Sequence, residues 1–250
     1  MNSGALWVMW DRQLKEFFRN KQRVVTSLFQ PLLFLFSLQF GIGAIFEESG
    51  NGNYLQFLIP GIVGISILMT STMNGMSLIW DKQFGFLKET LVAPVSRTKL
   101  LFGRCLGGAT TSTIQGIIVL IIGIIMGFKI ANLFSLPLAL LFMFSVSLLF
   151  NLFGTVIAAK FDDTQSFPTV INFLIMPMFF LSGALFPIEN FPKIIQLLAK
   201  FNPFSYCVDL IKHGLEGIGQ FRFSLDIIVI FSLIFVLGFV GTKLFDKLET

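Results

Sequence analysis

The chain has 250 residues and a formal net charge of +4, with 54% apolar residues, 13% charged residues and a mean hydropathy of +0.81. An average globular protein carries about 25% charged residues, so this composition excludes a soluble domain and a disordered chain and indicates an integral membrane protein. A single His and two Cys leave little material for a metal cluster or a disulfide framework, and we expect no metal site.

Residues 1–23 precede the first apolar run and have mixed charge. Trp10, Leu14 and Phe17 recur at positions i, i+4 and i+7, while Arg12 and Lys15 occupy other faces. This spacing predicts an amphipathic helix over residues 1–23 that lies on the inner membrane surface. The alternative is an ordinary charged leader to the first span.

Long runs without Asp, Glu, Lys, Arg or His follow, and a run of about 20 such residues is long enough to span a bilayer as a helix. The last charge-free run begins at Ile227, with Ser224–Asp226 as its outer cap. Because the runs are continuously apolar and do not alternate, they predict helices and not barrel strands. We expect one all-α membrane domain, 1–250, with six transmembrane helices at about 24–46, 55–80, 105–128, 133–159, 166–186 and 224–242.

Basic residues lie mainly on one side of this predicted map. Thirteen of the 18 Lys and Arg residues fall in the N-terminal segment, in the loop Asp81–Arg104, at Lys160 and in the C-terminal tail. Short loops rich in Lys and Arg stay in the cytoplasm, so we expect a multi-pass protein of the cell (inner) membrane with both termini cytoplasmic. The positive charge is then a topology signal, and no nucleic-acid partner is expected.

The charge-free runs contain no Asp, Glu, Lys, Arg or His that could bind a coupling ion or catalyse a reaction. Asp162–Asp163 is the nearest acidic pair, and we interpret it as a solvated turn that starts a helix. Gly107–Gly108 lacks the Gly-Lys-Ser/Thr ending of a phosphate-binding loop. We therefore expect no catalytic residue and no cofactor on this chain, with any energy source on another chain. A self-sufficient secondary carrier or channel remains an alternative, because backbone carbonyls of a broken helix can coordinate sodium.

The spans do carry mild polarity from hydroxyl and amide side chains, together with Met and Phe. Such residues often only pack helices together, but they would also suit a path for an amphipathic or lipid-like cargo. The candidate residues for a cargo path are Thr70, Asn74, Thr169, Asn172, Met176 and Phe179.

Two predicted loops contain apolar residues at helical spacing together with prolines, which indicates that they form short helices. In the cytoplasmic loop, Phe84, Leu87 and Leu91 share a helical face and Pro94 stops the helix, which predicts a short helix that docks into lipid headgroups or a protein groove. The outer segment Phe186–Gln220 contains three prolines and an amphipathic run, and we expect it to dip into the interface as short helices. His213, among charged residues of this segment, is expected to be a hydrated surface residue.

The sequence resembles the permease subunits of ABC-2 type exporters over nearly its whole length. The loop Glu89-Thr-Leu-Val-Ala-Pro94-Val-Ser-Arg97 is similar to the family's acid–leucine–Pro–Val–Ser pattern. The outer stretch Phe180-Leu-Ser-Gly183-Ala-Leu-Phe186-Pro187, followed by Asn202-Pro203-Phe-Ser-Tyr206, is similar to its Ser-Gly…Phe-Pro…Asn-Pro…Tyr signature. The overall pattern is nearest to the drug-resistance branch, typified by daunorubicin-type exporters.

This resemblance implies a half-transporter for efflux of a drug-like or lipid- or glycan-linked cargo. Two permease copies, expected to be identical, would form a dimer around the path, and two cytoplasmic ABC ATPase subunits would bind ATP and Mg and dock beneath it. The implied ATPase-coupling residues are Phe84, Phe86, Leu87, Lys88, Glu89, Leu91 and Pro94. The implied outer re-entrant segment contains Gly183, Phe186, Pro187, Asn202, Pro203 and Tyr206. Membrane lipids are the remaining expected partner.

Overall fold

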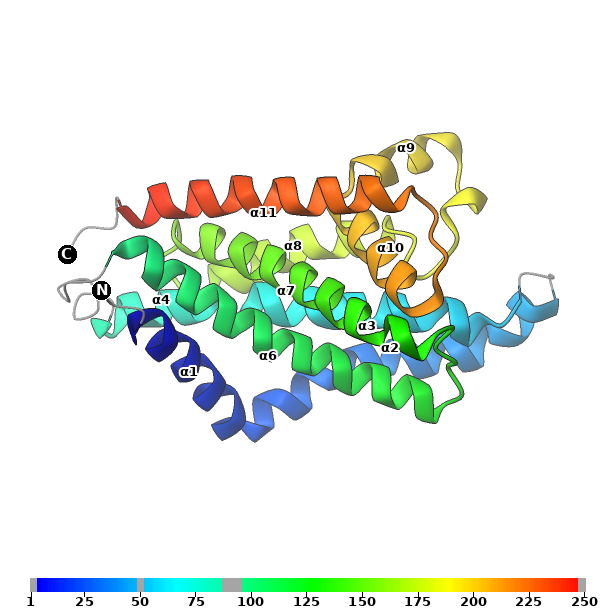
Figure 1. The fold of residues 1–250 in the computed structure, drawn as a ribbon, viewed down its shortest axis with the longest axis horizontal. Helices are drawn as coiled ribbons and strands as arrows, with labels where there is room; N and C mark the ends of the chain where they lie inside the picture. The colour runs from blue at the N-terminus through cyan, green and yellow to red at the C-terminus, as the bar shows by residue number, and fades with distance from the viewer. Residues whose placement is uncertain (1–3, 49–51, 87–95, 247–250) are drawn as a thin grey trace.

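The computed structural model describes residues 4–48, 52–86 and 96–246, and every regular element in these ranges is helical. Figure 1 shows long helices side by side along one axis of the molecule, joined by short turns at its two ends. The elements in chain order are α1 (Gly4–Arg19), α2 (Lys21–Glu48), α3 (Tyr54–Met73), α4 (Met76–Gln83), α6 (Arg97–Ile125), η1 (Leu133–Ser135), α7 (Leu136–Ala158), α8 (Ser166–Phe180), η2 (Ile188–Asn190), α9 (Lys193–Phe201), α10 (Pro203–Glu216) and α11 (Phe223–Asp246).

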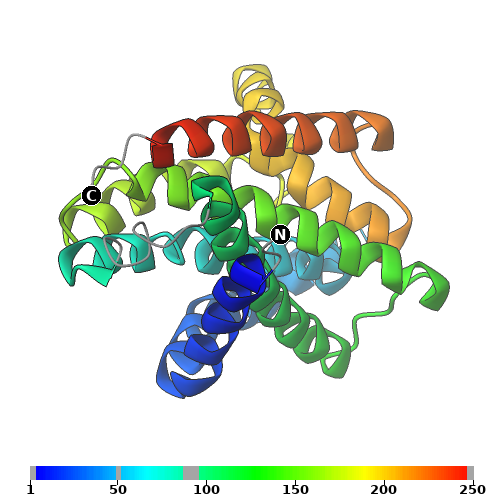
Figure 2. The same ribbon diagram turned by 60° about the vertical axis from the view of Figure 1, so that its left-hand side comes forward.

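The two ends of the bundle differ in what they carry. The first turn of α1, α4 and the last turn of α11 lie together at one end, hereafter the α1 end, and α9 and α10 lie at the other, the α10 end (Figure 1). Figure 2 shows α1 and α2 on one side of the bundle and α11 on the opposite side. The centre is α3: 78% of the apolar window of Tyr54–Gln83 is buried, against 17% for α2 and for α11. The two outermost helices therefore present most of their apolar surface outward.

Five helical segments are long and apolar enough to cross a membrane: Val24–Glu48, Tyr54–Gln83, Arg97–Ile125, Leu133–Ala158 and Phe223–Asp246. The structure does not confirm the expected count of six. The segment expected to span at 166–186 is helical only over Ser166–Phe180, or 15 residues, and Leu181 starts a turn. At 1.5 Å per residue such a helix is about 22 Å long, shorter than the roughly 30 Å hydrocarbon core.

The expected span at 55–80 is interrupted between α3 and α4. Asn74 and Gly75 separate the two helices, and the backbone here lies against α7. A Cβ on Gly75 would lie 2.5 Å from the carbonyl oxygen of Gly154, so only glycine permits this approach. The amide of Asn74 donates to the carbonyl of Gly108 at 3.2 Å and to Oδ1 of Asn151 at 3.3 Å. The interruption is thus held by packing and polar contacts from two other helices.

Helix α1 is packed against α6 and does not lie only on a membrane surface. A Cβ on Gly103 or Gly107 would lie within 3.0 Å of α1 atoms, namely Leu6 O and Gln13 Cβ. The indole Nε1 of Trp10 donates to the hydroxyl of Thr110 at 3.0 Å. Amphipathic spacing predicted this helix correctly. The sequence analysis placed its apolar face on the membrane surface, whereas in the structure α1 packs against α6.

The segment between α8 and α11 folds into short helices at the α10 end, as expected, and their re-entry into a membrane stays a prediction. Asn202 joins them to the bundle: its Nδ2 donates to the carbonyl of Met178 at 2.6 Å, and its Oδ1 accepts from the backbone N–H of Phe204. Pro203 occupies the first turn of α10, where a missing N–H is tolerated. The hydroxyl of Tyr206 donates to the carbonyl of Lys200, so α9 is held against α10.

Candidate functional site

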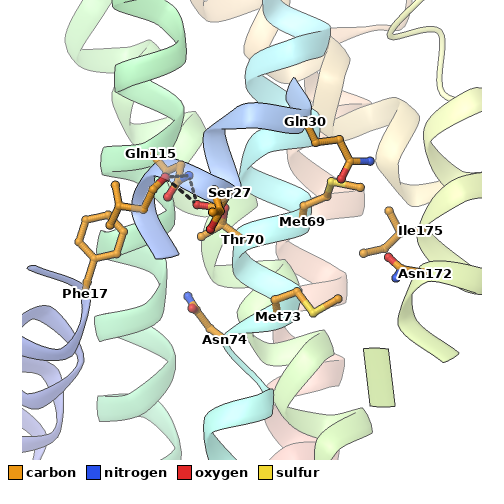
Figure 3. A pocket seen from close by; sticks show the side chains of 12 residues that line it. Phe17, Ser27, Gln30, Met69, Thr70, Met73, Asn74, Gln115, Asn172 and Ile175 are labelled. Carbon is orange, nitrogen blue, oxygen red and sulfur yellow. Dashed lines mark hydrogen bonds between the residues drawn. The ribbon is translucent and has the colours of Figure 1, made fainter. Parts of the chain in front are cut away.

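A pocket of about 260 Å³ lies between α2, α3, α6 and α8, next to the interruption of α3 (Figure 3). Among the described residues, its walls contain no Asp, Glu, Lys, Arg or His. Two methionines from α3, an isoleucine from α8 and a phenylalanine from α1 supply apolar surface, while amides and hydroxyls supply hydrogen-bonding groups. The lining residues are Phe17, Val24, Thr26, Ser27, Gln30, Met69, Thr70, Met73, Asn74, Gln115, Asn172 and Ile175.

Hydrogen bonds between helices fix part of this lining. The Nε2 of Gln115 on α6 donates to the hydroxyl of Ser27 on α2, as Figure 3 shows. Gln115 is buried, and its Oε1 accepts no hydrogen bond among the described residues. A pocket with flexible thioethers and a few polar groups can hold a molecule that has both apolar and polar parts, because it satisfies each without a fixed charge.

Three of the six residues proposed from sequence for a cargo path line this pocket, namely Thr70, Asn74 and Asn172. The other three do not. The hydroxyl of Thr169 donates to the carbonyl of Gln165, and Thr169 is exposed; Met176 is not among the described lining residues. Phe179 is buried, and its ring packs against a phenylalanine of α2.

Sequence reasoning also missed several lining residues. Ser27 and Gln30 come from α2, and Met69 and Met73 come from α3, where Met73 lies three positions after Thr70 and Met69 lies four positions before Met73. The available signal was helical spacing, since residues three or four positions from a candidate share its face. Gln115 is the buried amide of α6, and a polar side chain inside a predicted span is itself a signal of function.

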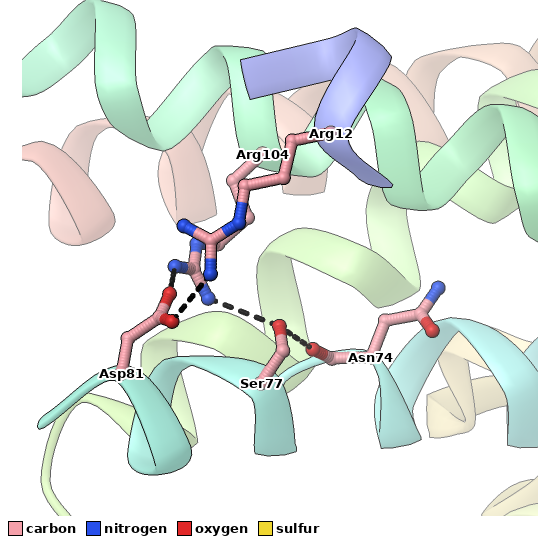
Figure 4. Close-up of polar contacts among 5 residues, drawn as sticks. All are labelled: Arg12, Asn74, Ser77, Asp81 and Arg104. Carbon is pink, nitrogen blue, oxygen red and sulfur yellow. Dashed lines mark hydrogen bonds and ion pairs between the residues drawn. The ribbon is translucent and has the colours of Figure 1, made fainter. Parts of the chain in front are cut away.

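A buried charge cluster lies at the α1 end, beside the pocket (Figure 4). One carboxylate oxygen of Asp81 on α4 pairs with the guanidinium of Arg12 on α1 at 2.6 Å, and the other pairs with Arg104 on α6. The side chains of Asp81 and Arg104 are 7% and 5% exposed, whereas that of Arg12 is 41% exposed. The cluster therefore joins three helices through one buried carboxylate.

The expected cytoplasmic loop Asp81–Arg104 is largely helical where the structure describes it. Helix α4 continues to Gln83 and α6 begins at Arg97, which places Asp81 and Arg104 inside packed helices. The sequence analysis placed both in a cytoplasmic loop, because they lie at the ends of charge-free runs. In the structure the two side chains pair with each other, which offsets part of the cost of burying a charge.

Polar contacts connect this cluster to the pocket. The guanidinium of Arg104 donates to the hydroxyl of Ser77 at 3.0 Å, and Ser77 donates to the carbonyl oxygen of Asn74 at 2.8 Å. Figure 4 shows these contacts in sequence along α4. Asn74 also lines the pocket, so a displacement of Asp81 has a continuous set of contacts along which it can reach the pocket wall.

The residues expected to couple the chain to an ATPase fall partly within the described structure. Helix α4 ends at Gln83, and Gly85 has a φ of +80°, so the expected helix does not begin at Phe84. The side chains of Phe84 and Phe86 are exposed, at 70% and 52%. The other expected coupling residues lie outside the described residues: Leu87, Lys88, Glu89, Leu91 and Pro94.

The turn between α7 and α8 lies next to α4. Lys82 donates to the carbonyl of Ala159 at 2.7 Å and pairs with Asp162 at 3.2 Å. Asp163 accepts from the backbone N–H groups of Gln165 and Ser166 and from the Ser166 hydroxyl, and these bonds lower the pKa of its carboxyl. The interpretation of this acidic pair as a solvated turn that starts a helix is confirmed.

At the α10 end, a buried lysine supports the expected outer segment. The Nζ of Lys212 donates to the carbonyl of Gly183 at 3.4 Å and lies 3.9 Å from the ring centroid of Phe57. Gly183 has a φ of +77°, which favours glycine in this turn. Burial lowers the pKa of Lys212 to about 8, and burial raises the pKa of Glu216 to about 7. Phe186 and Pro187 follow as the entry to η2.

Comparison with known proteins identifies the family. Residues 4–215 match the family model described as ABC-2 type transporter. The chain is 28% identical to the transport permease ycf38 of Cyanophora paradoxa, over 97% of this chain and 88% of the relative. It is 26% identical to nodulation protein J of Rhizobium leguminosarum bv. viciae, over 90% and 86%. It is 27% identical to the inner membrane transport permease YadH of Escherichia coli K12, over 93% and 92%. A match over most of an all-helical chain with membrane-spanning segments shows that this multi-pass membrane protein belongs to the ABC-2 type transporter family.

Proposed function

We propose that this chain is the permease subunit of an ATP-driven exporter and forms half of the path for an amphipathic cargo. The pocket next to Asn74 carries the proposal, because its lining combines methionines with amides and hydroxyls and has no charged group among the residues that the structure describes. Such a lining suits a drug-like, lipid-linked or glycan-linked molecule better than a hydrophilic ion, whose hydration shell it could not replace. The relatives named as transport permeases support transport as the activity.

The energy would come from a separate cytoplasmic ABC ATPase present in two copies, each binding ATP and Mg, so this chain would not itself be an enzyme. The exposed rings of Phe84 and Phe86 follow α4 directly and offer an apolar contact for that subunit. A push on α4 would reach Asp81 first. From there the contacts through Arg104 and Ser77 lead to the pocket wall at Asn74.

A second, identical permease copy would complete the path. Apolar side chains of α2 face outward, and Phe29 and Phe40 are among the most exposed. In a membrane these surfaces contact lipids or another copy of the chain. The protein would lie in the cell (inner) membrane with the α1 end in the cytoplasm, as the distribution of Lys and Arg favours. The drug-resistance branch of the family supplies the first cargo class to test.

Co-purification and reconstitution test this proposal. The permease is expressed with the ABC ATPase encoded beside it, captured by an affinity tag on the ATPase, and placed in proteoliposomes with a fluorescent amphipathic dye. We expect co-capture and ATP-dependent dye movement. Transport that proceeds without the ATPase, or driven by an ion gradient alone, would instead identify a self-sufficient carrier. A reporter at Thr250 that is active only outside the cell would overturn the proposed orientation.

A single substitution tests the docking contact. Phe84→Ala should leave the fold intact because the ring is exposed, but should weaken ATPase capture. Truncating a buried aromatic at an interface typically costs about 2 kcal/mol, or roughly 30-fold in affinity. Phe201→Ala, an equally exposed phenylalanine at the α10 end, serves as the control and should not alter capture. Equal capture by both variants would exclude Phe84 from the interface.

A further inference from the structure

Three potential metal ligands meet where α10 contacts α11, at the α10 end of the bundle. Asp209 and His213 lie four positions apart and therefore share one face of α10, and Asp226 lies in the first turn of α11. One ligand atom from each side chain lies within 4.8 Å of the other two. The short connection over residues 217–222 makes this approach possible, since it returns the chain directly from α10 to α11.

The two separations from the His213 nitrogen match those of neighbouring ligands around one ion. The Nε2 of His213 lies 3.6 Å from Oδ2 of Asp209 and 3.5 Å from Oδ2 of Asp226. Zinc binds nitrogen and oxygen at about 2.0–2.2 Å, so neighbouring ligand atoms at a tetrahedral ion lie about 3.3–3.5 Å apart. The carbonyl oxygen of Phe221 lies 3.3 Å from the same nitrogen, so a further oxygen atom lies beside the proposed imidazole ligand.

Burial supplies a second, independent observation. Asp226 is completely buried, and neither of its carboxylate oxygens accepts a hydrogen bond from any described residue. A buried carboxylate that accepts no hydrogen bond is costly, because no such bond replaces its lost hydration. Its Oδ2 lies near the imidazole nitrogen, so a cation between the two would satisfy it. Asp209, also buried, would bring a second negative charge to the same ion.

The arrangement also fixes the ligands in position. Both carboxylate oxygens of Asp209 accept backbone N–H groups, from Gln220 at 2.6 Å and from Phe221 at 2.8 Å. Such outer contacts orient a metal ligand, and each oxygen retains a lone pair for an ion. The side chain of His213 is only 16% exposed, not hydrated as the sequence analysis expected.

We propose that Asp209, His213 and Asp226 form a binding site for a divalent transition metal ion of the zinc type. One imidazole and two carboxylates are a ligand set that such ions accept, and a shared ion would fasten the start of α11 to α10. The sequence analysis expected no metal site because it counted only one His and two Cys. The proposed metal site is formed by residues of this chain alone, and the proposal does not depend on the proposed transport function.

The test uses Zn²⁺ and Co²⁺ with the purified full-length protein in detergent. After dialysis against Zn²⁺ and removal of free metal, elemental analysis should find one ion per chain. Co²⁺ should give visible absorption bands typical of a low-coordinate site, and Zn²⁺ should abolish them. Added Zn²⁺ should also raise the thermal midpoint, since a ligand that binds only the folded state stabilises it. Wild-type protein that retains no zinc and gives no Co²⁺ spectrum would overturn the proposal.

Three variants distinguish this site from adventitious binding. His213→Gln and Asp226→Asn should each lose the ion and the Zn²⁺-dependent rise in midpoint, whereas the exposed control Glu189→Gln should keep both. Zinc retained equally by all of them would place the ion elsewhere and refute the site. If either ligand variant does not fold, Gly219→Ala decides. Its Cβ would lie 2.1 Å from the Nε2 of His213, so it displaces the ring without removing a ligand, and unchanged zinc binding would overturn the proposal.

Discussion

Removal of the Asp81 carboxylate should destabilise the protein more than removal of any exposed charge near it. Asp81→Asn leaves the guanidinium of Arg104 buried, with 5% of its side chain exposed and no counter-charge. Breaking a buried pair in this way costs about 3–5 kcal/mol. Arg12→Gln removes a partner that is 41% exposed, and such a pair contributes about 1 kcal/mol or less.

Tryptophan fluorescence during thermal unfolding in detergent measures this difference. Trp10 lies on α1 and Trp80 adjoins Asp81, so both report on this end of the bundle. At about 2–4 °C per kcal/mol for a chain of this size, Asp81→Asn should lower the midpoint by about 10 °C. Asp162→Asn is the matched control, because it makes the same change at a carboxylate that is 92% exposed.

Comparison of Asp81→Asn with Asp162→Asn tests whether burial makes the Asp81 pair important for stability. A midpoint for Asp81→Asn within about 2 °C of the Asp162→Asn value would refute the view that burial makes this pair essential. A double replacement, Asp81→Leu with Arg104→Met, should recover much of the loss, since it removes both buried charges. If the thermal midpoint of the double variant is no higher than that of Asp81→Asn, the two charges stabilise the protein by more than compensating each other's burial.

Three further predictions concern other parts of the molecule. Gly75→Ala should lower the free energy of unfolding by about 1–3 kcal/mol, because the added Cβ would overlap the α7 backbone. Gly41→Ala, with open space around the added Cβ, should cause no loss. Equal thermal midpoints for the two variants would contradict this prediction. Burial raises the pKa of Glu216 from 4.5 to about 7, so folding favours the protonated carboxyl and this contribution to stability is lost as pH rises from about 4.5 through about 7. The thermal midpoint of the wild type should fall over this pH range. Glu216→Gln should remove this part of the dependence of the midpoint on pH. Asn172→Ala should raise the KM for dye transport several-fold with little change in the thermal midpoint. Thr169→Ala, one turn earlier on α8 and outside the pocket, should leave KM unchanged. A larger rise in KM for Thr169→Ala than for Asn172→Ala would exclude the pocket as the cargo site.

Apolar runs predicted most of the helices, because a bilayer span must be long and free of charge. The runs at 24–46, 133–159 and 224–242 fall almost entirely within helical segments of the structure. The same rule failed where charges are buried in pairs. Asp81 and Arg104 ended the predicted spans, yet each lies within a helix, because their mutual neutralisation depends on a contact between residues 23 positions apart.

The interruption of α3 and the docking of α1 were not predictable from local pattern alone. Asn74 lies in an apolar stretch, and its role depends on acceptors supplied by α6 and α7. For α1 a signal existed: Gly103-Arg-Cys-Leu-Gly107 places two glycines one turn apart, a spacing that permits close helix contact. The ligand cluster around Asp226 was missed for a different reason, since only the turn after α10 brings α11 back to His213.

The packing of α1 against α6 sets an order for biosynthesis. The contacts of α1 include residues 103–110 of α6, so α1 can reach its final place only after the α6 region has been synthesised and inserted. Until then its apolar face has no protein to cover it, and the membrane surface is the available shelter. The amphipathic pattern that predicts a surface helix thus describes a waiting position of the nascent chain. Closure of Trp10 onto Thr110 would then mark completion of the first half of the molecule.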